Sequence, residues 1–159
     1  MKAKDIMDPV TDYLTPEDTL QQAVQKMRAT KRWHGQGLKG MVILDQAGRL
    51  IGVLAIKDIL RATIPVYMDP RISKFSWDGM LETMASKVAC RKVKEFMSTR
   101  VVTVPEDAPL MRCVDLLIEK NLQRLPVVDA DNKVLGVVYI RDIYNLISKI
   151  FTEAPKCEI

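Results

Sequence analysis

The sequence predicts an α/β (α+β) chain of two β-α-β-β-α repeats, which we expect to pack sheet to sheet with pseudo-two-fold symmetry. Two observations lead to this fold class. Residues 41–58 match residues 125–142 without a gap: both contain an apolar run, an Asp turn, a Gly-centred apolar run and a closing basic-Asp-Ile. The segments that precede these two stretches also resemble each other. Internal duplication is therefore the organising feature of the chain.

Composition and charge are typical of an ordinary globular protein. The chain has 159 residues, of which 48% are hydrophobic, so it can bury a sizeable core. The formal net charge is +4, with basic and acidic residues interspersed and no Lys/Arg block. Nucleic-acid binding, which would show as affinity that falls steeply with salt, is an alternative that nothing in this charge pattern requires. We expect no nucleic-acid partner.

The N-terminus and the cysteines indicate a reduced, cytoplasmic location. Residues 1–9 have no apolar signal-peptide core, and no stretch approaches the ~20 apolar residues of a membrane helix, so we expect no membrane insertion. The three cysteines, Cys90, Cys113 and Cys157, show no metal-ligand spacing, and we expect no metal. Cys113 occupies an apolar helical position, where core packing is the expected role.

Each repeat begins with a short amphipathic turn, at residues 2–7 and 92–97, followed by an extended piece at 12–15 and 101–104. A one-sided helix comes next in both copies. Its apolar residues share the i, i+3, i+4, i+7 spacing. They are Leu20, Ala23, Val24 and Met27 in the first copy and Leu110, Cys113, Val114 and Leu117 in the second.

The residues ahead of these two helices predict how the helices begin. Asp18 and Asp107 are good N-cap residues, because a carboxylate can accept from free N–H groups of the first turn. Pro109 falls in the first turn of the second helix, where its missing N–H costs nothing.

A β-hairpin and a closing helix complete each repeat. The predicted strands are residues 41–44 and 50–54 in the first copy and 125–128 and 134–138 in the second. Asp45 and Asp129 open the turns, and Gly48 and Asn132 occupy the position that favours φ > 0. Gly52 and Gly136 lie inside the second strands, which suggests close approach of another group. The closing helices start near Asp58 and Asp142.

The domain organisation follows from these elements. We expect one repeat over residues 1–63, a connector over 64–91 with a helix at 76–89, the other repeat over 92–150 and a tail over 151–159. The helix has a one-sided apolar pattern that packs on the module or forms a Met-rich surface for a second copy.

The first repeat also contains a Gly-rich loop, residues 31–40, which has no counterpart in the second repeat. Trp33 and His34 in this loop either fold back on the body of the protein or contact a partner.

The duplicated elements resemble a tandem pair of CBS domains, also called a Bateman module, in a stand-alone form. The motifs that carry the resemblance are Gly-x-x-x-x-x-Asp at residues 52–58 and 136–142 and the Leu-Pro-Val-Val-Asp run at 125–129. The resemblance implies regulatory ligand binding in two clefts between the repeats. It implies an adenosyl ligand such as AMP, ADP, ATP or S-adenosylmethionine, and no obligatory cofactor.

The resemblance also assigns roles to individual positions. Asp58 and Asp142 match the acids that bind ribose hydroxyls. The expected adenine-pocket residues are Leu14, Thr15, Val42 and Ala55 in the first repeat and Thr103, Val104, Pro126 and Tyr139 in the second.

The phosphate position departs from the family pattern. Ala55 and Tyr139 stand where the family has a Ser or Thr that contacts phosphate. Lys57 and Arg141, at helix starts whose N–H groups and dipole favour an anion, are the candidate substitutes. Arg124, which precedes a strand in the second repeat only, could add a bidentate donor and would make one cleft the better phosphate site.

Each assignment has a structural alternative. Asp58 and Asp142 would stabilise the first turn of a helix by ~0.3–1 kcal/mol without any ligand. Lys57 and Arg141 can be solvated side chains. Tyr139 can serve packing instead of stacking on a base.

The resulting functional hypothesis is a regulatory module that senses an adenosyl ligand and signals to an unknown effector protein or to a second copy in a homodimer. The alternative is a ligand-free structural and dimerisation module. An enzyme is not expected, because the sequence contains no nucleophile–base pair, no Gly-rich phosphate loop of the Gly-x-x-x-x-Gly-Lys type and no metal-ligand cluster.

Overall fold

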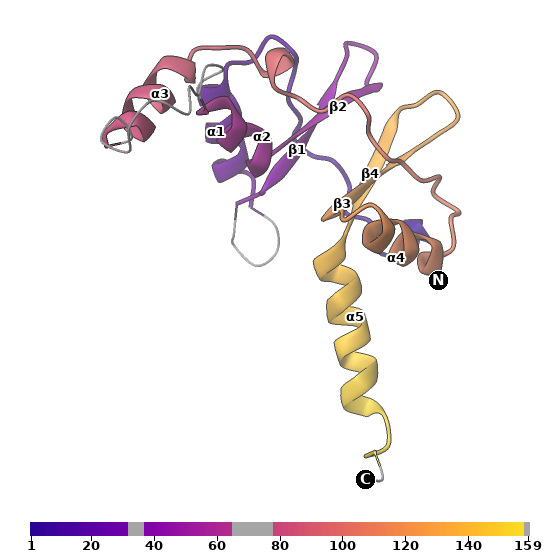
Figure 1. Cartoon of the computed structure of the whole chain (residues 1–159). Coiled ribbons are helices and arrows are strands. Elements are labelled where there is room, and N and C mark those ends of the chain that lie inside the picture. Colours follow the sequence, from indigo (N-terminus) through magenta and orange to yellow (C-terminus); the bar gives the residue numbers. More distant parts are fainter. Residues whose placement is uncertain (32–36, 65–77, 158–159) are drawn as a thin grey trace. The chain divides into compact units, whose positions relative to one another are not determined.

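The computed structural model describes residues 1–31, 37–64 and 78–157 (Figure 1). Strand β1 (Gly40–Leu44) pairs antiparallel with β2 (Leu50–Ala55), and β3 (Arg124–Val128) pairs antiparallel with β4 (Val134–Tyr139). Two small antiparallel sheets combined with helices confirm the α+β class. Trp33, His34 and the first residues of the expected connector helix lie outside the described residues.

The helices follow the predicted pattern of the two repeats. They are the 3₁₀ turns η1 (Ala3–Asp5) and η3 (Val93–Glu95) and the α-helices α1 (Leu20–Ala29), α2 (Ile56–Ala62), α3 (Met80–Val88), α4 (Leu110–Glu119) and α5 (Ile140–Glu153). Helix α5 extends well beyond the strands from which it starts (Figure 1). Its counterpart α2 ends three residues before Pro65 in the sequence, and the residue before a proline is disfavoured in helical conformation.

The hairpin turns form as predicted. The Oδ1 atom of Asp45 accepts from the backbone N–H groups of Ala47 and Arg49, at 2.9 Å each. Gly48 has φ 80° and Asn132 has φ 62°, so both occupy the left-handed region that Gly and Asn tolerate best. The strand register shifts by one residue next to each turn, which is the geometry of a turn followed by a β-bulge.

The predicted helix caps are wrong. The N-cap of α1 is Thr19, whose hydroxyl accepts from the N–H of Gln22, and the N-cap of α4 is Pro109, one position outside the helix. Asp18 instead accepts from the N–H of Thr15 at 2.9 Å. A short side chain can satisfy only nearby N–H groups, and the turn before the helix claims this carboxylate first.

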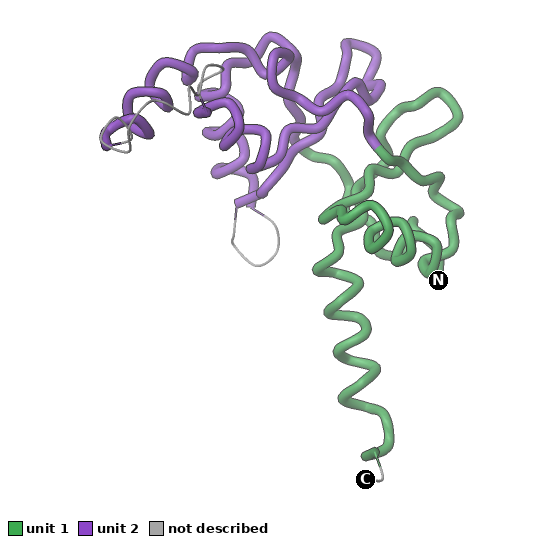
Figure 2. The backbone as a smooth tube through the Cα atoms, in the orientation of Figure 1, with its two compact units in different colours: residues 1–11, 102–159 green, residues 12–101 purple. Residues whose placement is uncertain are grey.

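The chain forms two compact units that exchange the leading segments of the sequence repeats (Figure 2). Unit 1 comprises residues 1–11 and 102–159, and unit 2 comprises residues 12–101. Ala3, from the start of the first repeat, is fully buried in the core of unit 1, and Val93 is fully buried in the core of unit 2. Each core therefore contains a turn contributed by the other sequence repeat.

Isolated β-bridges, each made by one residue, extend both two-stranded sheets at their edges. Leu14 and Val104, from the extended pieces predicted as first strands, each form one parallel bridge, to Ile43 and Val127. On the opposite edge of each sheet, the leading segment forms one antiparallel bridge. These bridges join Ser98 to Val53 in unit 2 and Asp8 to Val137 in unit 1.

The close approach expected at the two strand glycines is confirmed. A Cβ atom on Gly52 would lie 2.9 Å from the Met97 sulfur, and a Cβ on Gly136 would lie 2.6 Å from the backbone oxygen of Asp8. The approaching group is in both cases the exchanged leading segment, which explains why the strand has a glycine there.

Candidate functional site

The closing acid of unit 2, Asp58, lies at the third position of α2 and is 7% exposed. Its Oδ2 accepts from the backbone N–H of Ala55 at 2.8 Å. Its Oδ1 accepts from Arg61 Nη1 at 2.9 Å and from the Ser98 hydroxyl at 3.3 Å. Asp58 therefore stabilises the first turn of α2, the structural role that it can have without any ligand. The same contacts hold the carboxylate in a fixed orientation at the end of strand β2.

Asp142 is the matching acid of unit 1, at the third position of α5, and is half-buried. Its surroundings differ in sequence from those of Asp58. Asn145 stands where unit 2 has Arg61, and Asp8 stands where unit 2 has Ser98. The backbone of Asp8 exchanges two 2.9 Å hydrogen bonds with Val137, as Ser98 does with Val53 at 2.9 and 3.0 Å, so these two residues are equivalent.

The structure brings the adenine-pocket candidates together in pairs. The N–H of Leu14 donates to the carbonyl of Val42 at 2.9 Å, and the N–H of Val104 donates to that of Pro126 at 3.1 Å. Leu14 and Val104 belong to the hydrophobic cores, whereas Val42 and Pro126 are buried but outside the core clusters. Since side chains alternate along a strand, Val42 and Pro126 face the side of each sheet away from its core.

Hydrogen bonding also corrects how the two repeats are aligned here. Leu14 is equivalent to Val104, so Thr15 is equivalent to Pro105 and not to Thr103. The Pro-Glu-Asp motifs that follow are therefore offset by one residue between the repeats. Thr15 and Thr103 are both half-buried, but they do not occupy matching positions.

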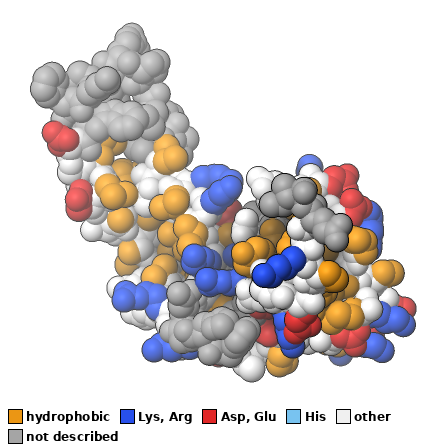
Figure 3. Space-filling model, turned by 90° about the horizontal axis from the view of Figure 1, so that it is seen from below, with side chains coloured by type: hydrophobic (Ala, Val, Ile, Leu, Met, Phe, Trp, Pro, Cys, Tyr) orange, Lys and Arg blue, Asp and Glu red, His pale blue; other side chains and the backbone are white. Residues whose placement is uncertain are grey.

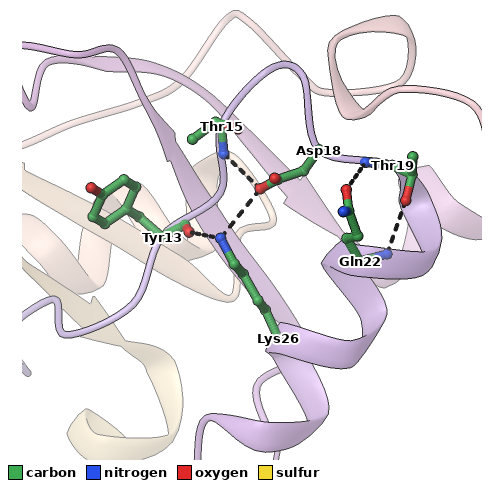
Figure 4. Close-up of polar contacts among 6 residues, drawn as sticks. All are labelled: Tyr13, Thr15, Asp18, Thr19, Gln22 and Lys26. Carbon is green, nitrogen blue, oxygen red and sulfur yellow. Dashed lines mark hydrogen bonds and ion pairs between the residues drawn. The ribbon is translucent and has the colours of Figure 1, made fainter.

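Lys26 of α1 and Asp18, which precedes this helix, hold the segment around Leu14 in place (Figure 4). Lys26 Nζ donates to the carbonyl of Tyr13 at 3.1 Å and lies 3.4 Å from Asp18 Oδ2. That carboxylate oxygen also accepts from the N–H of Thr15. The backbone on both sides of Leu14 is consequently tied to one helix.

The phosphate candidates lie at the ends of the strands and the starts of the closing helices. Lys57 and Arg141 are the second residues of α2 and α5, and both are exposed. Arg124 is half-buried at the start of β3, where it pairs in register with Tyr139. In unit 2 the same register pairs Gly40 with Ala55, so the bulk and charge at this position are confined to unit 1.

Sequence reasoning missed Ser98 and Arg61 as neighbours of Asp58. Arg61 could have been found, because Asp and Arg at i, i+3 on one helix commonly pair. Ser98 gave no local signal, since it lies 40 residues further along the chain and reaches Asp58 only through the exchanged segment.

The described residues contain neither a metal-ion cluster nor a helix that could span a membrane. There, no group of three His, Cys, Asp or Glu side chains is placed to hold a metal ion. No helix in the described part of the chain has the length and apolar character needed to cross a bilayer. Cys113 is fully buried in the core of unit 1, as predicted, and burial raises the pKa of its thiol.

Comparison with protein families and curated proteins gives consistent matches. The CBS domain family matches residues 3–64 and 93–149. Inosine-5'-monophosphate dehydrogenase from Methanocaldococcus jannaschii is 24% identical over 87% of the chain, but the chain spans only 21% of that enzyme. The chloroplastic CBS domain-containing protein CBSX2 of Arabidopsis thaliana is 26% identical over 81% of the chain, which spans 59% of that protein.

Solved structures share the fold. A crystal structure of CBSX2 in complex with AMP has a TM-score of 0.68 at 23% identity, with 94% of this chain and 98% of that chain covered. The CBS domain pair of protein MJ0100, in complex with 5'-methylthioadenosine and S-adenosyl-L-methionine, has a TM-score of 0.65 at 20% identity, with 94% and 98% covered.

Proposed function

Since the chain belongs to the CBS domain family, we propose that it is a regulatory CBS pair that binds an adenosine-bearing ligand beside the closing aspartate of each repeat. The observation that carries the proposal is the repeated placement of that acid. Asp58 and Asp142 each occupy the third position of a helix that directly follows a hairpin strand. A buried or half-buried carboxylate held there can accept hydrogen bonds from ribose hydroxyls.

Two structurally similar proteins support the class of ligand. CBSX2 was crystallised with AMP, and the MJ0100 pair with methylthioadenosine and S-adenosylmethionine. The adenine would lie against Leu14, Thr15, Val42 and Ala55 in one repeat and against Thr103, Val104, Pro126 and Tyr139 in the other. The phosphate, where present, would meet Lys57 or Arg141 with Arg124. We propose a regulatory role for this chain, and the activity of the dehydrogenase, of which it spans 21%, is not carried over to it.

Isothermal titration calorimetry with AMP, ADP, ATP, adenosine and S-adenosylmethionine tests this function. We expect saturable binding of at least one of these compounds. The Asp58→Asn/Asp142→Asn double variant should weaken it at least tenfold, because one carboxylate-assisted hydrogen bond is worth ~1.5–3 kcal/mol. Asp115→Asn, which changes an exposed acid on α4, should bind as the unmodified protein does. No heat with any ligand would contradict the proposal.

The second candidate is a dimerisation module, and an exposed apolar stripe favours it. Met111 and Ile118 on α4 are 77% and 71% exposed, and Val114 between them belongs to the same surface patch. Hydrophobic side chains exposed between charged ones are visible in Figure 3. The corresponding positions of α1 carry Gln21, Val24 and Arg28, so the stripe is a property of the second repeat.

The proposed partner of this stripe is a second copy of the chain. Arg112 and Asp115, whose side chains pair at 2.5 Å, flank the stripe with opposite charges. If two copies of α4 pack antiparallel about a two-fold axis, the Arg112 of each copy faces the Asp115 of the other, which makes the surface complementary to itself. Helix α5 adds further exposed apolar residues, namely Tyr144, Ile150 and Phe151.

Light scattering during gel filtration tests the dimer. We expect a mass twice that of the chain, and a single-chain mass for the Met111→Glu/Ile118→Glu variant. The matched control, Gln21→Glu/Arg28→Glu on α1, should remain dimeric. A single-chain mass for the unmodified protein would contradict the dimer without bearing on ligand binding.

A further inference from the structure

We infer that Ser98 is a specificity-determining residue of the Asp58 site: its hydroxyl competes with the ribose of the ligand for the Asp58 carboxylate and lowers the preference for ribose over 2'-deoxyribose. This inference rests on the proposed function, which places an adenosine-bearing ligand beside the closing acid. It goes further by naming the group that limits how many sugar hydroxyls this acid can accept.

Three donors already occupy the carboxylate of Asp58. Its Oδ2 accepts from the backbone N–H of Ala55 at 2.8 Å, and its Oδ1 accepts from Arg61 Nη1 at 2.9 Å and from the Ser98 hydroxyl at 3.3 Å. Because Asp58 is only 7% exposed, solvent supplies few further donors. A carboxylate offers about four lone-pair positions, so about one position remains for a ligand.

The ribose of an adenosine compound carries two neighbouring hydroxyls, so it donates more hydrogen bonds than Asp58 can still accept. One of the present donors must leave before both hydroxyls can bind. The Ala55 N–H is part of the backbone at the start of α2, and the contact from Arg61 is short and charge-assisted. The contact from Ser98 is the longest of the three and its donor is neutral, so this contact is the one that the ribose displaces.

The backbone of Ser98 stays in place when its hydroxyl turns away. Its N–H donates to the carbonyl of Val53 at 2.9 Å, and its carbonyl accepts from the N–H of Val53 at 3.0 Å. Ser98 is exposed, so water can replace the carboxylate as the partner of the hydroxyl. Rotation of one side chain is therefore enough to free a position on Asp58, and the bridge to Val53 does not depend on the hydroxyl.

Calorimetry with AMP and 2'-deoxy-AMP tests this competition in the Asp142→Asn background, in which the other site is weakened. Ser98→Ala removes the competing hydroxyl. We expect it to tighten the binding of AMP about two- to tenfold, the effect of one neutral hydrogen bond. The binding of 2'-deoxy-AMP should tighten less than about twofold, because its single ribose hydroxyl fits the position that is already open.

Further variants separate competition from a structural effect. Ser98→Thr retains the hydroxyl and should leave both affinities unchanged. Thr99→Ala changes the exposed hydroxyl of the next residue and should also leave them unchanged. Ser98→Cys, whose thiol is a weak donor, should repeat the result of Ser98→Ala with a side chain of similar size. Thermal melting checks the folding of each variant, and a purely structural role of Ser98 would lower the melting temperature without tightening AMP binding.

The outcomes separate this inference from the proposed function. Weaker or unchanged AMP binding by Ser98→Ala, or equal gains for the two nucleotides, overturns the inference while adenosine binding stands. Absence of binding by both nucleotides also overturns the inference, and absence of binding by S-adenosylmethionine as well overturns the proposed function.

Discussion

The two units use different side chains to hold the extended segment that lies just ahead of their first long helix. In unit 2, Lys26 and Asp18 form a polar clamp on the segment around Leu14. The equivalent positions in unit 1 are Leu116 and Ala108, which are 8% and 7% exposed and belong to the hydrophobic core. The backbone hydrogen bonds that position Leu14 and Val104 are the same.

This difference separates the backbone features that both units share from the side chains in which they have diverged. The backbone bridges and the turn residues are shared, so they define the fold. Side chains around them have diverged from polar to apolar at the clamp and from Ser98 to Asp8 at the bridge on the sheet edge. The two units therefore share a backbone scaffold whose surrounding side chains differ.

The largest expected difference in the free energy of unfolding is between a substitution of the apolar residue in unit 1 and a substitution of the polar clamp in unit 2. Leu116→Ala should lower the free energy of unfolding by about 2–5 kcal/mol, because it leaves a cavity in the core of unit 1. Lys26→Ala should cost less than about 1 kcal/mol, because the lysine is 44% exposed and its ion pair is screened by solvent. Urea denaturation of both variants measures the difference. Equal losses would show that the polar clamp contributes as much as the core residue.

Substitutions of the two glycines that contact the exchanged segments should have the next largest effect on stability. Gly136→Ala places a Cβ 2.6 Å from a backbone oxygen of Asp8, and relief requires a backbone shift. We expect a loss of about 1–3 kcal/mol. Gly52→Ala should cost less, because its nearest contact is the Met97 side chain, which can move, and its nearest backbone atom, the Ser98 oxygen, lies further away, at 3.0 Å. A larger loss at Gly52 in the same denaturation assay would contradict the close contact at Gly136.

The caps of the first long helices give a smaller contrast. Thr19→Ala removes the hydroxyl that accepts from Gln22 N–H at 3.1 Å, and should cost about 1 kcal/mol. Pro109→Ala removes no side-chain cap, so we expect a smaller change in melting temperature. Equal decreases in melting temperature for the two substitutions would contradict the capping role of Thr19.

The smallest effect should depend on pH and involves Glu17. Hydrogen bonds from Lys92, and then from Lys94 at 2.8 Å, lower the pKa of Glu17 from 4.5 to about 2. A carboxylate with a lowered pKa stabilises the fold fully above its unfolded value, and this contribution is lost as pH falls from about 4.5 towards 2. The stability difference between the unmodified protein and Glu17→Gln should therefore shrink over that interval.

A substitution of the equivalent acid in unit 1 provides the control for Glu17→Gln. Asp107→Asn removes the acid at the equivalent position of unit 1 and is measured in the same acid titration followed by circular dichroism. A difference between the unmodified protein and Glu17→Gln that stays constant from pH 6 to pH 2 would contradict the lowered pKa.

Local signals were enough to predict most elements of the fold. The hairpins followed from Asp45 with Gly48 and from Asp129 with Asn132, whose turn chemistry depends only on neighbouring residues. The helix faces followed from apolar spacing. The caps were predicted wrongly, because the Asp18 carboxylate is claimed by Thr15 in the preceding turn.

The exchange of leading segments could not be predicted, because it depends on distant contacts. Residues 2–7 and 92–97 are similar enough to fit either sheet, so pattern alone assigns each to its own repeat. The neighbours of the closing acids depend on this exchange, which brings Ser98 to Asp58 from the second repeat. The acids themselves could be named from the motif, but the charges around them could not.

Native mass spectrometry of the protein with AMP and methylthioadenosine present together tests the central claim most directly. We expect each chain to bind up to two of these molecules, one beside each closing aspartate, with Asp58→Asn and Asp142→Asn each retaining one and the double variant retaining none. Chains that bind neither compound, or that retain both in the two variants, would contradict the assignment of the ligands to these acids.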